Sequence, residues 1–220
     1  MKVLESSKAL VLLSGGIDSA VALWLIKKRF DVYALSFKLN ERNSMEIEAA
    51  RKIFKKADVE EHMIIDVGFL REVSELRELK ENYILKHSNI PSIYIPSRNT
   101  VFFGIASYFS EIIGARYIIT GHQLSDPFPD SKPRYIKAMN TALKFGSWLG
   151  KDFKTEIYMP LAKFDKKRIV ELAIEMDVPI ELSWSCHKNE SVACGKCRGC
   201  VSRLEAFEQL GVKDKIKYQE

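Results

Sequence analysis

The sequence predicts an α/β protein in which a parallel sheet carries helices on both faces. Short aliphatic runs at residues 9–13, 31–37, 62–67 and 115–121 have the composition of buried strands. Segments with helical spacing lie between these runs, and this alternation is typical of a parallel sheet. The 220 residues suffice for one such domain, and a hydrophobic share of 46% is that of an ordinary globular core.

The first half of the chain alternates regularly. Residues 9–13 (ALVLL) form the first expected strand, and residues 18–29 (DSAVALWLIKKR) have the spacing of an amphipathic helix. Residues 31–37 (DVYALSF) read as the second strand. Residues 43–57 place their apolar side chains on one face of a helix, and residues 62–67 (HMIIDV) form the third strand.

The second half continues the pattern. Residues 98–113 are apolar nearly all round, end at Gly114, and predict a buried helix before a fourth strand at residues 115–121. Residues 165–176 (DKKRIVELAIEM) predict a late helix. The tail at residues 213–220 is expected to be solvated and partly frayed.

We expect two parts within this architecture. Residues 1–180 are expected to form an α/β domain. Residues 181–220 are expected to form a C-terminal segment with four cysteines and a helix, packed on the same domain. The apolar residues 201–212 (VSRLEAFEQLGV) suit either a homodimer interface or packing on the chain's own core.

Composition narrows the function classes. A formal net charge of +5 is modest and spread along the chain, so no stable nucleic-acid partner is expected. The apolar stretch at residues 100–115 carries Glu111 and is too short to cross a bilayer, so no membrane partner is expected. No basic-then-apolar signal segment opens the chain. We therefore expect a cytoplasmic protein.

The stretch SGGIDS breaks the chain between the first strand and the first helix. Gly15 and Gly16 allow positive φ and let a ligand approach the backbone closely. The helix that follows directs free N–H groups into the same space, and Ser14 and Ser19 add hydroxyls, which suits phosphate or pyrophosphate. No Lys-Ser or Lys-Thr closes the stretch, so it is not a Walker A loop. A tight turn with capping serines remains the alternative.

All four cysteines lie close together near the C-terminus. Cys186, Cys194, Cys197 and Cys200 have the spacing C-x7-C-x2-C-x2-C, which lets four thiolates converge on one ion. We expect a structural zinc, because four thiolates leave no open position for a substrate. An iron–sulfur cluster is compatible with the spacing, and disulfides are disfavoured in a cytoplasmic enzyme.

The pattern Ser-Gly-Gly-x-Asp-Ser resembles the PP-loop of adenine-nucleotide α-hydrolases. Together with IPSRN, ITGH, MPLAKFDK and SWSCHKNESVACGKCRGC, in this order and spacing, it resembles the 7-cyano-7-deazaguanine synthase (QueC) family from the first strand to about Phe207. The resemblance implies ATP-dependent conversion of 7-carboxy-7-deazaguanine and ammonia to the nitrile through adenylated intermediates. It also implies Mg²⁺, AMP- or ADP-type products with pyrophosphate or phosphate, and the paired subunits common in the family.

Two segments depart from the family pattern, residues 38–44 and 124–132. Both would border the acceptor substrate. A PP-loop tRNA-modifying enzyme of the thiolation type, or a diverged paralogue that adenylates another carboxylate, therefore remains open. So does a nucleotide-binding or interaction module without turnover.

The resemblance also implies roles for individual residues. The nucleotide would be bound by eight residues: Ser14, Gly15, Gly16, Ile17, Asp18, Ser19, Ser36 and Phe37. The last two would hold adenine through backbone groups, and Mg²⁺ would lie between Asp18 and the phosphates. The catalytic candidates are Asp18, Ser19, Arg98 and Asp126. The substrate would contact Arg98, Asn99, His122, Asp126, Asp130 and Lys163. Lys166 is a second candidate for phosphate, and the aromatic candidates for stacking on a base are Phe102, Phe128 and Trp184.

Overall fold

The computed structural model describes residues 7–39, 44–70, 72, 94–148, 154–188 and 191–219. Within these residues, five parallel strands form one sheet in the order β3-β2-β1-β4-β5. The strands are β1 (Lys8–Leu12), β2 (Asp31–Lys38), β3 (Glu61–Asp66), β4 (Ala115–Ile119) and β5 (Glu156–Tyr158). The α/β class expected from the sequence is confirmed.

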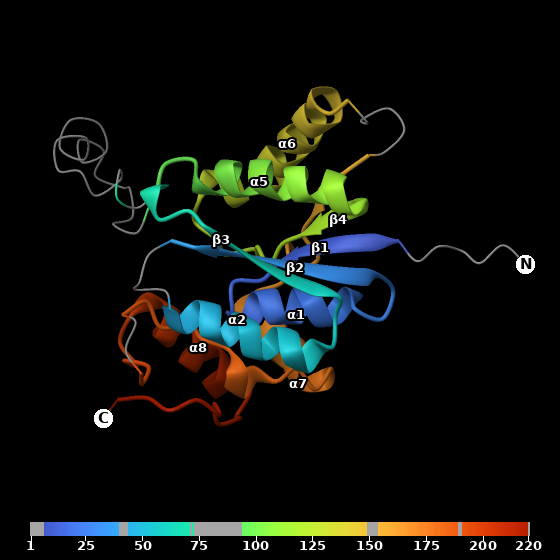
Figure 1. Cartoon of the computed structure of the whole chain (residues 1–220). Coiled ribbons are helices and arrows are strands. Elements are labelled where there is room, and N and C mark those ends of the chain that lie inside the picture. Colours follow the sequence, from blue (N-terminus) through green and yellow to red (C-terminus); the bar gives the residue numbers. More distant parts are fainter. Residues whose placement is uncertain are drawn as a thin grey trace, which may run out of the picture.

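Helices cover both faces of this sheet (Figure 1). One face carries α5 (Arg98–Ile113) and α6 (Pro133–Gly146). The other carries α1 (Ile17–Ile26), α2 (Ser44–Ala57), α7 (Lys166–Glu175) and α8 (Arg198–Gln209). Two short 3₁₀ turns, η3 (Pro129–Ser131) and η4 (Ile180–Leu182), complete the described elements.

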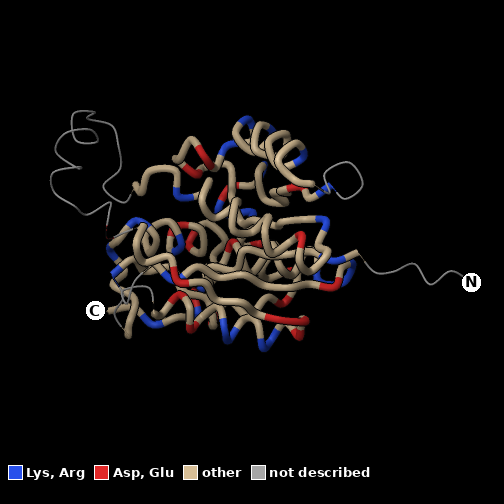
Figure 2. The backbone as a smooth tube through the Cα atoms, turned by 45° about the horizontal axis from the view of Figure 1, so that its top comes forward, with Lys and Arg blue, Asp and Glu red and all other residues tan. Residues whose placement is uncertain are grey.

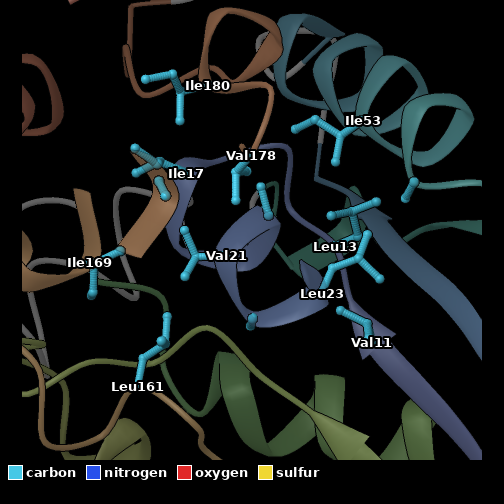
Figure 3. Close-up of a cluster of buried hydrophobic side chains, with 14 of the residues drawn as sticks. Val11, Leu13, Ile17, Val21, Leu23, Ile53, Leu161, Ile169, Val178 and Ile180 are labelled. Atoms are coloured by element: carbon cyan, nitrogen blue, oxygen red, sulfur yellow. The ribbon is translucent and has the colours of Figure 1, made fainter. Parts of the chain in front are cut away.

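The larger core lies on the α1 side of the sheet. Helix α1 is buried along most of its length, because it is covered by the sheet, α2 and α7. Figure 3 shows Ile17 and Val21 of α1 facing Ile169, Val178 and Leu161 from later parts of the chain. Burial of this apolar surface fixes α1, and therefore the loop that precedes it, against the sheet.

Helix α5 is covered on one face, so the expected buried helix is buried only on the side that faces the sheet. Phe103 and Ala106 are buried against the sheet, whereas Tyr108 and Ile112 are 62% and 63% exposed. The reason is geometric: the sheet can cover only one side of a helix lying on it, and α6 does not cover the other side fully.

The strand order creates a crevice between β1 and β4. The chain places β2 and β3 on one side of β1, then returns to place β4 on the opposite side. The segments that leave β1 and β4 therefore diverge at the carboxyl edge of the sheet, where parallel α/β proteins bind ligands. The stretch SGGIDS leaves β1, and residues 120–126 leave β4, so both border this crevice.

The C-terminal tail is anchored, which corrects the expectation of a frayed end. Asp214 is 8% exposed and forms an ion pair with the fully buried Arg203, 2.7 Å from Nε to Oδ2. Tyr218 forms a β-bridge with Ala193. Helix α8 packs on α7 and contributes Phe207 to the larger core. The division of the chain near residue 180 stays a prediction.

Charged residues are spread over both helical layers of the described chain, basic and acidic positions lying among one another (Figure 2). Among the residues that the structure describes, no helix combines the length and apolar character needed to cross a membrane.

Candidate functional site

The glycine loop, residues 14–19, turns sharply between β1 and α1. Gly15 uses positive φ (84°), whereas Gly16 has an ordinary φ of −79° as the residue before α1. A Cβ on Gly15 would lie 2.1 Å from the backbone oxygen of Glu46 in α2. Gly15 is therefore required both by its φ and by the close approach of α2.

The two serines of the loop bond to each other and to the loop backbone. The Ser19 hydroxyl donates to the Gly16 carbonyl (2.9 Å) and accepts from the Ser14 N–H (3.2 Å). The two hydroxyl oxygens are 3.1 Å apart. Within the described residues no side chain caps α1, so the N–H groups of its first turn face the crevice without a capping partner from that part of the chain. This leaves the anion site of a helix N-terminus open to a ligand.

Lys166, from the start of α7, reaches the loop from the far end of the chain. Its Nζ lies 2.6 Å from Oδ1 of Asp18, and the two side chains are 16% and 26% exposed. The ammonium of Lys166 offsets the negative charge of Asp18 in the first turn of α1. The pair also places an ammonium group beside the N-terminus of α1, where anions are stabilised.

Two cavities meet at the glycine loop. The inner cavity, about 300 Å³, lies among the ends of β1, β2 and β4 and the start of α5. The outer cavity, about 270 Å³, lies between the glycine loop, residues 123–128 and the start of α8. Both are lined by Ser14, Asp18, Glu46 and Asp126.

Arg98 lines the inner cavity with a guanidinium that no described residue hydrogen-bonds. Its guanidinium carbon lies 5.9 Å from the ring of Phe102 and 5.5 Å from that of Phe128. Burial lowers the pKa of Arg98, while Asp130, Glu46 and Asp126 oppose this shift. A half-buried cation with unused donors is suited to bind a phosphate or a carboxylate.

Asn99 and Asp130 are brought together, but they bind each other. The backbone N–H and the side-chain amide of Asn99 each donate to one Asp130 oxygen, both at 3.0 Å. Asp130 is buried and lines neither cavity, whereas Asn99 lines the inner one. This pair fixes the start of α5, and through it Arg98.

The residues after β4 divide between the cavities. His122 lies in the inner cavity, with Nδ1 2.9 Å from the Thr120 hydroxyl, and burial lowers its pKa despite the opposing charge of Asp126. Asp126 lines both cavities and accepts from the Gln123 N–H at 3.0 Å. Lys163 is exposed and lines neither cavity. The lysine that lines the outer cavity is Lys166.

At the end of β2, the side chain of Ser36 hydrogen-bonds to other parts of the fold. Its hydroxyl donates to the Leu13 carbonyl and lies 2.7 Å from Nε2 of His62. Phe37 stacks on Phe102, with centroids 4.0 Å apart and ring planes 9° apart. The inner cavity thus has an aromatic wall and, beside it, the backbone edge of β2.

The structure adds two residues that sequence reasoning did not assign to the site, Gly121 and Glu46, and it gives Trp184, a candidate for base stacking, a backbone contact that was not foreseen. Gly121 lies so close to α1 that a Cβ would be 2.8 Å from the Ser19 nitrogen. Glu46 lines both cavities, and Trp184 donates its backbone N–H to the Gly15 carbonyl at 2.9 Å. Only Gly121 had a local signal, a glycine directly after a strand; the other contacts depend on tertiary packing.

The four cysteines converge as their spacing predicts. Their sulfur atoms all lie within 4.8 Å of one another. Hydrogen bonds from the backbone N–H groups of Lys196 and Cys197 lower the pKa of Cys194 to about 6, against the effect of burial. Burial raises the pKa of Cys186 and Cys200. A bound cation is what would hold the two buried thiols as thiolates, so the group fits a metal ion.

A family model described as "Queuosine biosynthesis protein QueC" matches residues 8–211. The 7-cyano-7-deazaguanine synthase of Thermoplasma volcanium is 36% identical over 218 residues, covering 96% of this chain and 90% of that protein. The synthase of the same name from Campylobacter jejuni is 35% identical over 224 residues, covering 97% and 99%. Among solved structures, the U34-tRNA thiolase NcsA from Methanococcus maripaludis, with its [4Fe-4S] cluster, superimposes with a TM-score of 0.51 at 17% identity, covering 93% of this chain and 65% of that one. That last likeness concerns the fold alone.

Proposed function

The chain belongs to the QueC family of queuosine biosynthesis proteins, and we propose that it converts 7-carboxy-7-deazaguanine and ammonia to 7-cyano-7-deazaguanine with ATP. It is an enzyme, as its relatives are. The proposed class is an ATP-dependent carbon–nitrogen ligase. The observation that carries the proposal is the uncapped N-terminus of α1 at the β1–β4 crevice, with Lys166 beside it and the half-buried Arg98 in the adjoining cavity.

The proposed reaction has two activation steps. A carboxylate oxygen of the substrate attacks the α-phosphorus of ATP, and pyrophosphate leaves. Ammonia then attacks the acyl carbon, and AMP leaves to give the amide. The amide oxygen attacks a second ATP in the same way, and pyrophosphate leaves; loss of AMP and of both protons of the amide nitrogen then gives the nitrile. Each step needs orientation and charge screening rather than a covalent enzyme intermediate.

The described residues can supply that orientation and screening. The first-turn N–H groups of α1 and the ammonium of Lys166 would hold the departing pyrophosphate. Adenine would lie along the backbone of Ser36 and Phe37 at the inner cavity. Arg98 would bind the α-phosphate or the substrate carboxylate, positioned by the Asn99–Asp130 pair. When bound, Mg²⁺ would supply charge neutralisation near Asp18.

We propose zinc as the metal of the four cysteines. A tetrahedral zinc with Zn–S bonds of about 2.3 Å places its sulfurs roughly 4 Å apart, and the four sulfurs here lie within 4.8 Å of one another. An iron–sulfur cluster needs more room, because its four thiolates are divided among two or four irons instead of meeting on one ion. We further expect a homodimer and a free base rather than RNA as acceptor.

The test is product analysis by mass spectrometry after incubation with ATP, Mg²⁺, ammonium and 7-carboxy-7-deazaguanine. Formation of the nitrile with AMP supports the proposal. Lys166→Met should reduce AMP formation at least about 100-fold, because a charged group acts directly on the leaving group. Lys167→Met, at the exposed neighbouring position, is the matched control and should be unaffected.

Two outcomes of this test contradict the proposal. If ATP binds but no nitrile forms, the acceptor is another carboxylate or a tRNA base, and AMP release with tRNA separates the two. If Lys167→Met is impaired as strongly as Lys166→Met, the pairing of Lys166 with Asp18 has no special role.

A further inference from the structure

Arg203 is fully buried, and Nε, Nη1 and Nη2 of its guanidinium all donate hydrogen bonds to residues outside α8. Nε and Nη2 donate to the two oxygens of Asp214 at 2.7 and 2.9 Å. Nη1 donates to the Ser183 hydroxyl at 2.7 Å, and Nη2 also donates to the Ile180 carbonyl at 3.0 Å. Tyr218 donates to the same Asp214 at 2.5 Å. One guanidinium thus joins α8, the C-terminal tail and residues 180–183.

Stability alone is a weak reason for such a group. Removing a guanidinium from water is costly, and replacing a buried ion pair by apolar residues of similar volume is often neutral or stabilising. The burial of Asp214 would raise its pKa, but the hydrogen bonds from Arg203 outweigh this and lower it. The pair is therefore charged, and its rigid geometry is what an apolar replacement could not reproduce.

The segment that Arg203 holds leads directly to the glycine loop. Trp184 follows Ser183, and its backbone N–H donates to the Gly15 carbonyl at 2.9 Å. Carbonyl and N–H point in opposite directions across a trans peptide. When Trp184 holds the Gly15 carbonyl on one side, the Gly16 N–H points to the other, where it donates to the Ser14 hydroxyl at 3.3 Å, and Ser14 lines both cavities.

We propose that Arg203 is a positioning residue for the glycine loop: by holding Ser183 and Ile180, it keeps Trp184 bonded to Gly15 and so keeps the Gly16 N–H directed at the Ser14 hydroxyl, on the side of the loop that would face the phosphates. This inference rests on the proposed use of ATP at that loop. Without the bond from Trp184, the peptide between Gly15 and Gly16 can rotate, since glycine has the freedom to do so. A rotated peptide would present a carbonyl oxygen to the phosphates.

The test compares two variants that loosen this connection with one that does not. Ser183→Ala removes one partner of Arg203 and leaves the ion pair with Asp214. Arg203→Lys keeps the charge but lacks the fork that reaches Asp214, Ser183 and Ile180 together. Tyr218→Phe, the matched control, removes a hydrogen bond from the same buried carboxylate while every bond made by Arg203 remains.

The measurement is the Kd of the full-length protein for ATP with Mg²⁺, by calorimetry, well below each variant's Tm and with metal content recorded. Arg203→Lys should weaken ATP binding about tenfold and Ser183→Ala about threefold, in line with the loss of one or two hydrogen bonds. Tyr218→Phe should lower the Tm at least as much as Ser183→Ala and leave the Kd within about twofold. Metal content should be that of the wild type throughout.

Three results would overturn the inference. Unchanged ATP binding in both Arg203→Lys and Ser183→Ala would show that the loop does not depend on this connection. Equal weakening in Tyr218→Phe would show a general loosening of the buried cluster instead of positioning. Absence of ATP binding by the wild-type protein would overturn the proposed function, and this inference with it.

Discussion

Gly121 offers a sharp test of how closely the β4 side of the crevice approaches α1. A Cβ at this position would lie 2.8 Å from the nitrogen and 3.1 Å from the Cα of Ser19, and 3.0 Å from the carbonyl carbon of Asp18. All three are backbone atoms and cannot rotate away. Gly121 has no positive φ, so the effect of Gly121→Ala is steric alone.

The size of the effect follows from these distances. Restoring an ordinary contact of about 3.4 Å or more requires the backbone segments to separate by about 0.6 Å. Overpacking of this kind costs about 1–3 kcal/mol of stability. The displaced atoms belong to the first turn of α1, and a misplacement of about 1 Å can cost about 100-fold in rate. We therefore expect kcat/KM of Gly121→Ala to fall about tenfold to 100-fold.

Gly104→Ala is the matched control, because it makes the same substitution where no described atom, apart from the adjoining backbone of α5, lies within 4 Å of the new Cβ. It lies inside α5, where alanine is favoured over glycine by about 0.5–1 kcal/mol. Urea unfolding and nitrile formation should show a stabilised, fully active Gly104→Ala. If Gly121→Ala matched the wild type in stability and in kcat/KM, the close approach of the two segments would be refuted.

Two further predictions concern pH and the metal. Burial, with a smaller contribution from Arg51, lowers the pKa of His62 from 6.5 to about 4. Between these pH values the unfolded chain therefore binds a proton at His62 that the folded chain does not. The free energy of unfolding should fall by at most about 3 kcal/mol as the pH drops from 6.5 to 4. His62→Gln should reduce the change of the urea-unfolding midpoint with pH between pH 6.5 and 4. If the midpoint of the variant still changes with pH as in the wild type, the titration of His62 is not the cause. Cys197→Ser should lower both the Tm and the bound metal measured by elemental analysis; full metal content at wild-type stability would argue against a metal held by all four cysteines.

Local patterns were enough for most of the fold. The strands before and after the glycine loop, and the helix between them, were predicted from aliphatic runs and helical spacing within a few residues of their observed bounds. No element was assigned to α6 or to β5, which has only three residues and a charged start. The C-terminal tail was predicted to be frayed because its residues are polar. It is anchored by an ion pair between Asp214 and Arg203 of α8, which a local sequence pattern does not predict.

The candidate site also has parts that local sequence predicts and parts that it does not. The residues of the glycine loop lie close together in the sequence, as do the four cysteines, so their spacing was enough to predict both. The contact of Lys166 with Asp18 joins residues 148 positions apart, and it exists only because the order of strands brings the start of α7 beside the start of α1. Asp130 was assigned to the substrate by its place after β4, whereas its partner is Asn99, and that pairing requires the packing of η3 on α5.

The cysteine segment therefore has a second consequence beyond stability. Gly199 follows Cys197 by two residues, and a Cβ there would lie 2.1 Å from the Ser185 carbonyl oxygen, so the start of α8 is packed closely against residues 185–187. The segment that contains residues 185–187 begins at Trp184, whose backbone N–H donates to the Gly15 carbonyl. A metal that holds Cys186 and Cys197 together would thus also set the distance between α8 and the glycine loop, and with it the width of the outer cavity. If the cysteines hold a metal, its removal should weaken nucleotide binding before it causes unfolding. Within the described residues, one backbone hydrogen bond joins Trp184 to the glycine loop, whereas the core beneath α1 is held by the sheet.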